Sequence, residues 1–533
     1  MHARYRRRLS APLRAVVHAT SLAGRRLRAL VTNVDPAPLD YPFVHSDVAR
    51  LHQLRPDAQR VSLDAATWDD LLCDRYLDTL SPGVSIFGQQ ALYLRLRQGV
   101  AAPHRNASAA RIAALAADPM RMEALTIACA PLRQADCEVA GMLFGDEVAT
   151  VPAWDALTWL LMLVVPAVVA TIFVQPWCAL LLLALVVGLI SVQAHHDSAI
   201  SQWTRTTAAL QAMLVASARL GAQSAEGFAG VAPLAPKIGR GLVRSPWFKL
   251  FPLLRDYLDW FTLANLRHYF ASVRLAQEHG ALLRTCYDLC ATLDADLALA
   301  RHVCARPEVC WARFGAARTL MLEGMIHPLL AQAEPLSLAL QGDGAFITGQ
   351  NGSGKSTLMR SVGLNLAVAR GFGFCYARSA LLPDLPVFTS MQSEDSLLGG
   401  ESLFLAELRR ARELIEAAGN GAVILVDEIF RGTNYAESVS GAVAVLEKLT
   451  AHALVVASSH NVVLARLLAG QLTALCMGRD DAGVLTLAPG VLEQTNAIAL
   501  LADHGMDGAV HARALEVFKW LNDQAGVPSA LHR

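Results

Sequence analysis

The chain has few charged residues and no excess of either sign. Asp, Glu, Lys and Arg make up 17% of its 533 residues, whereas an ordinary soluble protein has roughly 25%. The formal net charge is zero, which excludes the global positive field that attracts nucleic acid to many proteins. The apolar share of 54% instead predicts segments that lie in lipid or in unusually large cores. The length predicts more than one domain.

The chain also lacks the cysteine spacing of a zinc site. None of its ten cysteines forms a C-x-x-C pair. The nearest pair, Cys286 and Cys290, has no histidine in register, as a tetrahedral metal site would need. We therefore expect free thiols in a reducing compartment.

A secretory signal is missing as well. The first 30 residues contain eight arginines and no acid, and no apolar stretch of the length of a signal peptide follows them. Residues 1–65 are predicted to be a basic arm followed by a proline-containing linker. The arm is either solvated or held to anionic lipid headgroups, and the sequence leaves both open.

A long uncharged segment follows in the first half of the chain. Residues 156–194, 39 in all, include no Asp, Glu, Lys or Arg, and one membrane-spanning helix needs about 20 apolar residues. Gln175 and Pro176 lie in the middle, where a turn would fall, and Trp154 and Trp177 lie near the ends of the two halves. This pattern predicts a two-helix transmembrane hairpin over residues 153–196. The alternative is a buried helical hairpin in a soluble core.

The rest of the chain divides into helical and mixed parts. Apolar residues spaced three and four apart predict a helical core in two parts, residues 66–152 and 197–315. From residue 316 to 533, short β-type runs alternate with helical segments, which is typical of an α/β domain. The expected fold class is thus α+β and multidomain: a helical core with a transmembrane hairpin, followed by an α/β domain.

A glycine-rich segment in this last part fits the pattern G-x-x-x-x-G-K-S/T. It follows a predicted strand and begins a predicted helix, which is the context of a P-loop. Loop and helix N–H groups bind phosphate oxygens there, Lys355 reaches the β- and γ-phosphates, and the Ser356 hydroxyl coordinates Mg²⁺. The expected ATP-binding residues are Gly349, Asn351, Gly352, Ser353, Gly354, Lys355, Ser356 and Thr357.

Two further strands are expected to bring catalytic groups to this loop. An apolar run over residues 422–426 ends in Asp427 and Glu428. Asp427 is expected to join Ser356 at Mg²⁺, and Glu428 to orient or deprotonate the attacking water. A second run over residues 454–457 leads to His460, expected to sense the γ-phosphate at the carboxyl edge of the sheet. Glu428, His460 and Lys355 are the predicted catalytic residues.

The run from Asp427 to Asn434 resembles the D-E-x-x-R-G-T segment of MutS-type ATPases, whereas transport ATPases of the ABC class typically have D-E-P. Four other segments resemble the same family in the same order: His327-Pro328, residues 401–407, Ser459-His460, and the Pro-Gly to Gly stretch from residue 487 to Gly505. The resemblance implies an ABC-class P-loop NTPase that uses ATP and Mg²⁺. It also implies a homodimer in which Ser402 reaches the γ-phosphate of the neighbouring subunit in trans.

The chain departs from the family in several places. The Gly-Arg half of the family's G-R-H-P motif is not kept, and no Phe-x-Glu tripeptide occurs. Only about 65 residues precede the helical core, which leaves no room for a mismatch-reading domain. Leu398-Gly399-Gly400 faintly resembles the L-S-G-G-Q signature of ABC transporters, but both signatures occupy the same structural place.

These observations predict a MutS-like ATPase anchored in the inner (cytoplasmic) membrane through residues 153–196, with its ATPase domain in the cytoplasm. ATP hydrolysis would drive closure of a homodimer, with DNA as a candidate ligand and no wedge-type reading of mismatches. The first alternative is a membrane-tethered ATPase that acts on an unidentified protein partner and has no role on DNA. The second is the motor of a transporter, for which two spanning helices per chain are few.

Overall fold

The computed structural model describes residues 41–57, 60–145, 151–152, 167, 169–171, 175, 177–244, 259, 263–342, 344–350, 352–391, 403–480, 483–492 and 506–524. The chain forms two compact units. Unit 1 comprises Met1–Pro56, Ser81–Leu92 and Ala117–Ala298, and unit 2 comprises Asp57–Leu80, Tyr93–Ala116 and Leu299–Arg533. Helices and mixed sheets together make the fold α+β, as expected.

The described part of unit 1 is helical. Its elements are α2 (His45–Leu54), the first part of α5 (Ile86–Gln98), α7 (Pro119–Cys129), η1 (Ala130–Gln134), α8 (Ala140–Phe144), α10 (Cys178–Ala222), η3 (Phe228–Gly230), α11 (Ala235–Leu242), α14 (Ala264–Glu278) and most of α15 (Gly280–Ala305). Distant segments join through buried polar groups: Asp294 in α15 accepts hydrogen bonds from the Ser85 backbone N–H at 3.0 Å and hydroxyl at 2.6 Å. Helix α2 lies within the segment that the prolines predict to be a linker.

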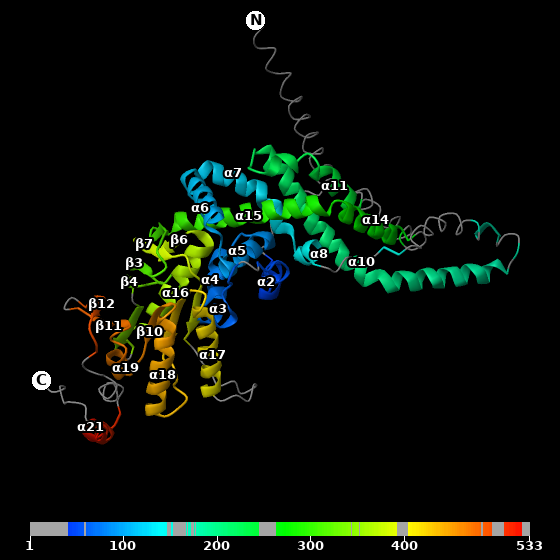
Figure 1. The fold of residues 1–533 in the computed structure, drawn as a ribbon. Coiled ribbons are helices and arrows are strands. Elements are labelled where there is room, and N and C mark those ends of the chain that lie inside the picture. The colour runs from blue at the N-terminus through cyan, green and yellow to red at the C-terminus, as the bar shows by residue number, and fades with distance from the viewer. Residues whose placement is uncertain are drawn as a thin grey trace, which may run out of the picture. The chain divides into compact units, whose positions relative to one another are not determined.

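The expected transmembrane hairpin falls only partly on described residues. Its first half lies largely outside them. Its second half begins α10, a single helix of 45 residues that continues to Ala222, well beyond the expected end at residue 196 (Figure 1). Among the described residues, one helix, Leu183–Ala222, is long and apolar enough to cross a membrane, and 6% of its apolar window is buried. The two-helix transmembrane hairpin and its alternative, a buried helical hairpin, both stay predictions.

The described residues of unit 2 form three sheets. The largest has the order β12-β11-β5-β10-β9-β8, and its strands are β5 (Gly344–Gly349), β8 (Val387–Ser390), β9 (Val423–Asp427), β10 (Leu454–Ser458), β11 (Leu472–Arg479) and β12 (Leu485–Pro489). All neighbours are parallel except β12, which is antiparallel to β11. A four-stranded sheet has the order β2-β7-β3-β4, and β1 pairs with β6. These strands are β1 (Val309–Trp311), β2 (Arg313–Gly315), β3 (Thr319–Met325), β4 (Leu336–Gln341), β6 (Phe374–Tyr376) and β7 (Ser379–Pro383).

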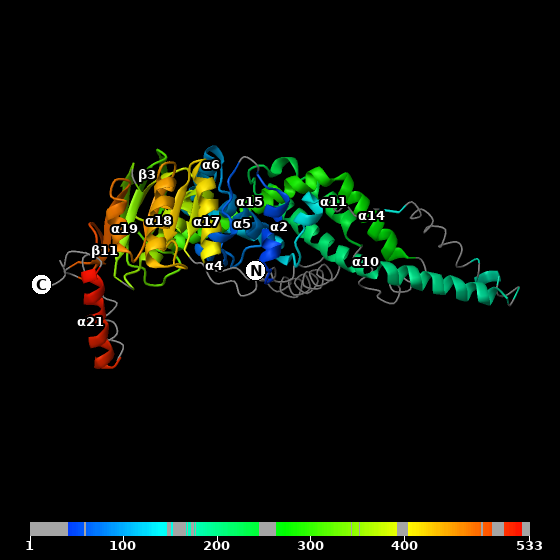
Figure 2. The ribbon, with the colours of Figure 1, turned by 60° about the horizontal axis from the view of Figure 1, so that its bottom comes forward.

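Helices cover both faces of the six-stranded sheet. Helices α17 (Leu403–Ala418), α18 (Tyr435–Thr450) and α19 (Val462–Leu467) lie side by side on one face (Figure 2). Their apolar side chains pack with those of alternate strand positions, such as Ile424 and Val426. Leu425 faces the opposite side, where α16 (Lys355–Phe372) lies. Burial on both faces explains why β5, β9 and β10 are continuous apolar runs.

Two segments from early in the chain complete unit 2. They contain α3 (Ala65–Asp70) and α4 (Cys73–Leu80), and then the end of α5 with α6 (Ala102–Ala117). Helix α3 lies against β8, at the edge of the six-stranded sheet. The C-terminal helix of the described chain is α21 (Gly508–Gln524).

Candidate functional site

The glycine-rich segment links β5 to α16. Gly349, the last residue of β5, has no room for a side chain, because a Cβ there would lie 2.8 Å from Oγ of Ser353 and 2.9 Å from the carbonyl oxygen of Met477. Gly354, with φ +97°, takes a backbone conformation that other residues rarely adopt. The loop therefore turns tightly into the first residue of the helix. Asn351 lies outside the described residues.

Lys355 begins α16 and is buried. Its Nζ donates hydrogen bonds to the carbonyl oxygens of Gly349 at 2.9 Å and Gln350 at 3.1 Å. Burial lowers the pKa of Lys355, and the nearby Asp427 and Glu428 oppose that shift. The ammonium group is thus held across the loop opening.

The same loop offers groups that an anion could satisfy. Within the part of the chain that the structure describes, the Ser353 hydroxyl is buried and has no hydrogen-bond partner. Ser356 and Thr357 are exposed on the first turn of α16, where backbone N–H groups have no partner inside the helix. A buried hydroxyl, a helix N-terminus and a lysine together fit a phosphate group.

Asp427 ends β9 beside this loop. Its carboxylate is buried and accepts a hydrogen bond from the hydroxyl of Ser458, the last residue of β10. Strand β10 lies between β9 and β5, and its last residue, Ser458, is opposite Asp427 of β9 and Ile347 of β5. The carboxyl ends of β5, β9 and β10 therefore meet at one edge, as expected. The role of Ser458 was not predicted, because the strand pattern does not show which side chain faces the acid.

Glu428 follows in a left-handed backbone conformation, with φ +57°. Its Oε1 contacts Nε2 of His460, and its Oε2 lies 3.4 Å from Nη1 of Arg431. The hydrogen bond with His460 is the main cause that lowers the pKa of Glu428, burial opposes it, and the charges of His460, Arg431 and Lys355 add to the lowering. Glu428 is therefore an anionic carboxylate at neutral pH.

Glu407, on α17, supports the loop that follows Glu428. Its carboxylate accepts hydrogen bonds from the backbone N–H groups of Arg431 at 3.0 Å and Gly432 at 3.2 Å. Glu407, Arg431 and Gly432 all lie in the segments that resemble the MutS family, but the sequence did not predict the contact between them. The signal that could have found this contact is Glu407 itself, an acidic residue that is buried on a helix and therefore needs hydrogen-bond donors nearby.

The His327 of the predicted His-Pro motif lies apart from this cluster. His327 follows β3 of the four-stranded sheet, where its Nδ1 accepts the N–H of Leu329 at 3.3 Å. Ser402 lies outside the described residues, as do residues 398–401. The structure thus brings Lys355, Asp427, Glu428 and His460 to one sheet edge, with Ser356 and Thr357 on the adjoining helix.

These elements define an α/β domain with a glycine-rich strand–loop–helix junction and two carboxylates at the next strand end. Residues 345–478 match the family model described as MutS domain V. This part of the chain is therefore similar to domain V of the MutS family.

Curated relatives agree with this assignment. The chain is 33% identical over 175 residues to the DNA mismatch repair protein MutS of Haloquadratum walsbyi, a match that covers 31% of this chain and 18% of that protein. It is 30% identical over 249 residues to MutS of Thermus aquaticus, which covers 45% of this chain and 30% of that protein. With the DNA mismatch repair protein MSH3 of Phaeosphaeria nodorum it shares 34% over 174 residues, 31% of this chain and 16% of that protein. The match spans less than a third of the length of each relative.

Proposed function

We propose that unit 2 binds ATP with Mg²⁺ and hydrolyses it to ADP and phosphate. The observation that carries this proposal is the meeting of the glycine-rich loop, Lys355, Asp427 and Glu428 at one edge of a parallel sheet. Ligands of open α/β sheets bind outside the carboxyl ends of the strands. In this proposal the residues that hold ATP are those of the loop and the first turn of α16, from Gly349 to Thr357.

The side chains divide the work of hydrolysis. Lys355 exchanges its carbonyl contacts for the β- and γ-phosphates, and Ser356 and Asp427 hold Mg²⁺. The ion supplies charge neutralisation for the transferred phosphoryl group. Glu428, anionic at neutral pH, accepts a proton from the attacking water or orients it, and His460 holds the Glu428 carboxylate in place and faces the γ-phosphate.

The proposed biological setting is the inner (cytoplasmic) membrane. The exposed apolar side chains of Leu183, Val187 and Ile190 on α10 support a spanning segment, because exposed apolar surface of this extent is unfavourable in water. Residues 153–196 would form the anchor, with unit 2 in the cytoplasm, where ATP is present.

We further propose that the chain acts as a homodimer that closes on ATP, with Ser402 completing the neighbour's site. The relatives are named as DNA mismatch repair proteins, which supports DNA as a ligand of this chain. The second candidate is an ATPase that acts on a protein partner in the membrane, and the exposed apolar part of α10 favours it.

One experiment separates these functions. The full-length protein is purified in detergent, returned to vesicles, and assayed for phosphate release alone, with duplex DNA, and with a membrane-protein fraction. Stimulation of phosphate release by DNA supports the function on DNA, and stimulation by the membrane-protein fraction supports the function on a protein partner. Wild-type phosphate release no faster than that of Glu428→Gln would defeat the proposal of ATP hydrolysis.

A further inference from the structure

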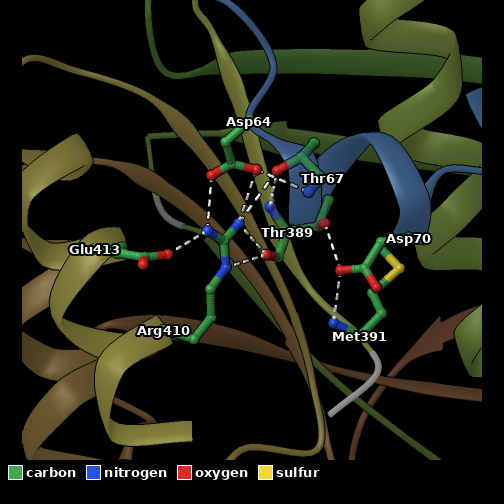
Figure 3. A network of polar contacts seen from close by, with 7 residues as sticks. All are labelled: Asp64, Thr67, Asp70, Thr389, Met391, Arg410 and Glu413. Carbon is green, nitrogen blue, oxygen red and sulfur yellow. Dashed lines mark hydrogen bonds and ion pairs between the residues drawn. The ribbon is translucent and has the colours of Figure 1, made fainter. Parts of the chain in front are cut away.

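Side chains from α3 cover the open edge of the six-stranded sheet (Figure 3). Strand β8 pairs with β9 on one side, and an unpaired strand edge leaves N–H and C=O groups without partners. The Thr389 N–H donates to Oγ1 of Thr67 at 3.0 Å, and the Met391 N–H donates to Oδ2 of Asp70 at 2.9 Å. The Thr389 carbonyl accepts from Nε and Nη2 of Arg410 at 2.9 and 2.6 Å. These side chains stand where a neighbouring strand would be.

Arg410 connects α3 to α17. Its Nη1 and Nη2 donate to the two carboxylate oxygens of Asp64 at 2.7 and 3.2 Å, and Nη1 also donates to Glu413 at 2.8 Å. Asp64 in turn caps α3 by accepting the Thr67 N–H at 2.7 Å. Paired contacts of this kind between guanidinium and carboxylate fix orientation as well as distance, so the start of α3 is tied directly to α17.

One turn earlier on the same helix, Glu407 holds the loop after β9. Its carboxylate accepts hydrogen bonds from the N–H groups of Arg431 and Gly432. The backbones of the loop and the helix are also in close contact. A Cβ on Gly432 would lie 2.8 Å from the backbone nitrogen of Phe404. The side chain of Arg431, in this loop, also forms an ion pair with Glu428, so a shift of the loop would shift the Glu428 carboxylate.

The loop needs such support. Glu428 and Phe430 have φ values of +57° and +59°, and non-glycine residues in this region are strained unless their surroundings hold them. A carboxylate that acts on water must also keep its position to within a fraction of an ångström to be effective. Glu407 supplies two fixed hydrogen bonds directly after the strained residues.

We propose that Glu407 is a positioning residue for Glu428, and that α3 acts on the same loop from a distance through Arg410 and α17. This inference rests on the proposed ATPase function. Neither Glu407 nor Asp64 would touch the nucleotide. Together they make ATP turnover depend on how a segment from the N-terminal part of the chain packs on the sheet edge.

The test compares four full-length variants with wild type: Glu407→Gln, Asp64→Asn, Glu428→Gln and Glu416→Gln. Glu416 is the matched control, because it lies on the same helix with its side chain exposed and pairs with Arg412. For each variant, kcat, KM for ATP, binding of a fluorescent ATP analogue and the midpoint of thermal unfolding are measured.

A glutamine at position 407 can accept only through its single carbonyl oxygen, so one loop N–H loses its partner. We expect Glu407→Gln to lower kcat by about tenfold or more, about 1.4 kcal/mol, with KM within about twofold. Asp64→Asn should lower kcat in the same way but less, and Glu416→Gln should change neither.

Three results would overturn the inference. If the wild type hydrolyses ATP and kcat is unchanged in both Glu407→Gln and Asp64→Asn, this inference is wrong and the proposed function stands. Parallel loss of ATP binding, kcat and thermal midpoint in Asp64→Asn and Glu407→Gln assigns both residues to folding only. A wild-type rate no higher than that of Glu428→Gln removes the proposed function, and this inference with it.

Discussion

Nε2 of His460 contacts Oε1 of Glu428, so the residues that follow β10 and β9 form one acid–imidazole unit. The contact joins two residues that the sequence placed separately, one as a sensor and one as the group that acts on water. It also explains why the pKa of Glu428 is lowered although the side chain is half-buried. The first prediction concerns Glu428 together with Lys355.

Lys355 and Glu428 should separate ATP binding from hydrolysis. Lys355→Ala removes the ammonium group at the loop and should weaken ATP binding. Glu428→Gln should retain ATP but hydrolyse it at least about a hundredfold more slowly, because general-base catalysis contributes on that order. Equilibrium binding and single-turnover hydrolysis measure the two effects. Turnover in Glu428→Gln equal to that of wild type would sink the assignment.

The second prediction concerns a composite site in the dimer. A heterodimer of Lys355→Ala and Ser402→Ala chains has one site with both lesions and one with neither, if Ser402 acts in trans. Mixing the two inactive variants should therefore restore up to roughly a quarter of wild-type turnover, because half the dimers are mixed and each has one intact site. Subunit exchange is verified with differently tagged chains. Mixed dimers without activity would contradict trans action.

The third prediction is an acid sensitivity that comes from His327. Burial lowers the pKa of His327 to about 4, and Arg360 adds to the shift. The folded ring stays neutral while the unfolded chain takes up a proton near pH 6.5. The free energy of unfolding should then fall as the pH falls from about 6.5 to about 4, by up to about 1.4 kcal/mol per pH unit.

His327→Asn keeps an acceptor for the Leu329 N–H but does not titrate. The variant should show a shallower loss of stability between these pH values, measured as the midpoint of thermal unfolding. Some slope should remain, because burial also lowers the pKa of His302 to about 4. His452→Asn, at an exposed position, is the control. Equal slopes in wild type and His327→Asn would refute the assignment.

The fourth prediction concerns the membrane anchor. Deletion of residues 155–196 removes the uncharged run and should move the protein from the membrane fraction to the soluble fraction. Each span of about 20 apolar residues is sufficient to hold a chain in a bilayer. High-salt and carbonate washes distinguish insertion from surface attachment. An intact chain that is soluble without detergent would show that the run belongs to a protein core.

The fifth prediction is equal binding of matched and mismatched DNA. The sequence contains no Phe-x-Glu tripeptide that could insert an aromatic ring into a base stack and meet the displaced base with an acid. Contacts from basic residues to phosphates carry no mismatch information, so any affinity should fall with salt.

The measurement compares a homoduplex with the same duplex that has one G·T mismatch, with and without ATP. A preference of roughly tenfold for the mismatch, about 1.4 kcal/mol, would reveal a reading element elsewhere in the chain. Absence of binding to either duplex at low salt would favour the protein-partner function.

Local sequence pattern predicted the sheet strands that build the site. The apolar runs expected over residues 422–426 and 454–457 coincide within a residue with β9 and β10, and the strand expected before the glycine-rich segment is β5. Strands buried on both faces are apolar throughout, so their ends are marked by the first polar residues. In β9 and β10 these residues are Asp427 and Ser458, whereas β5 already contains the polar Thr348 and ends at Gly349.

Long-range side-chain contacts were not predictable in this way. Asp64, Thr67 and Asp70 form an ordinary helix start in sequence terms, and the pattern does not indicate that their partners lie at Thr389 and Arg410. In the structure, residues 57–80 and 93–116 group with the C-terminal part of the chain, and the local pattern does not indicate this grouping.

The covering of β8 by α3 has a consequence for synthesis of the chain on the ribosome. Thr67 leaves the ribosome 322 residues before Thr389, the residue whose N–H it accepts. At about 5–20 residues per second, this interval is roughly 15 to 65 seconds. During that time the polar side chains of α3 lack their partners on β8 and α17. Helix α3 can cover the sheet edge only after synthesis has passed Thr389 and Arg410. A C-terminal fragment expressed alone would have β8 without its cover, and such an edge is a template for association with another strand.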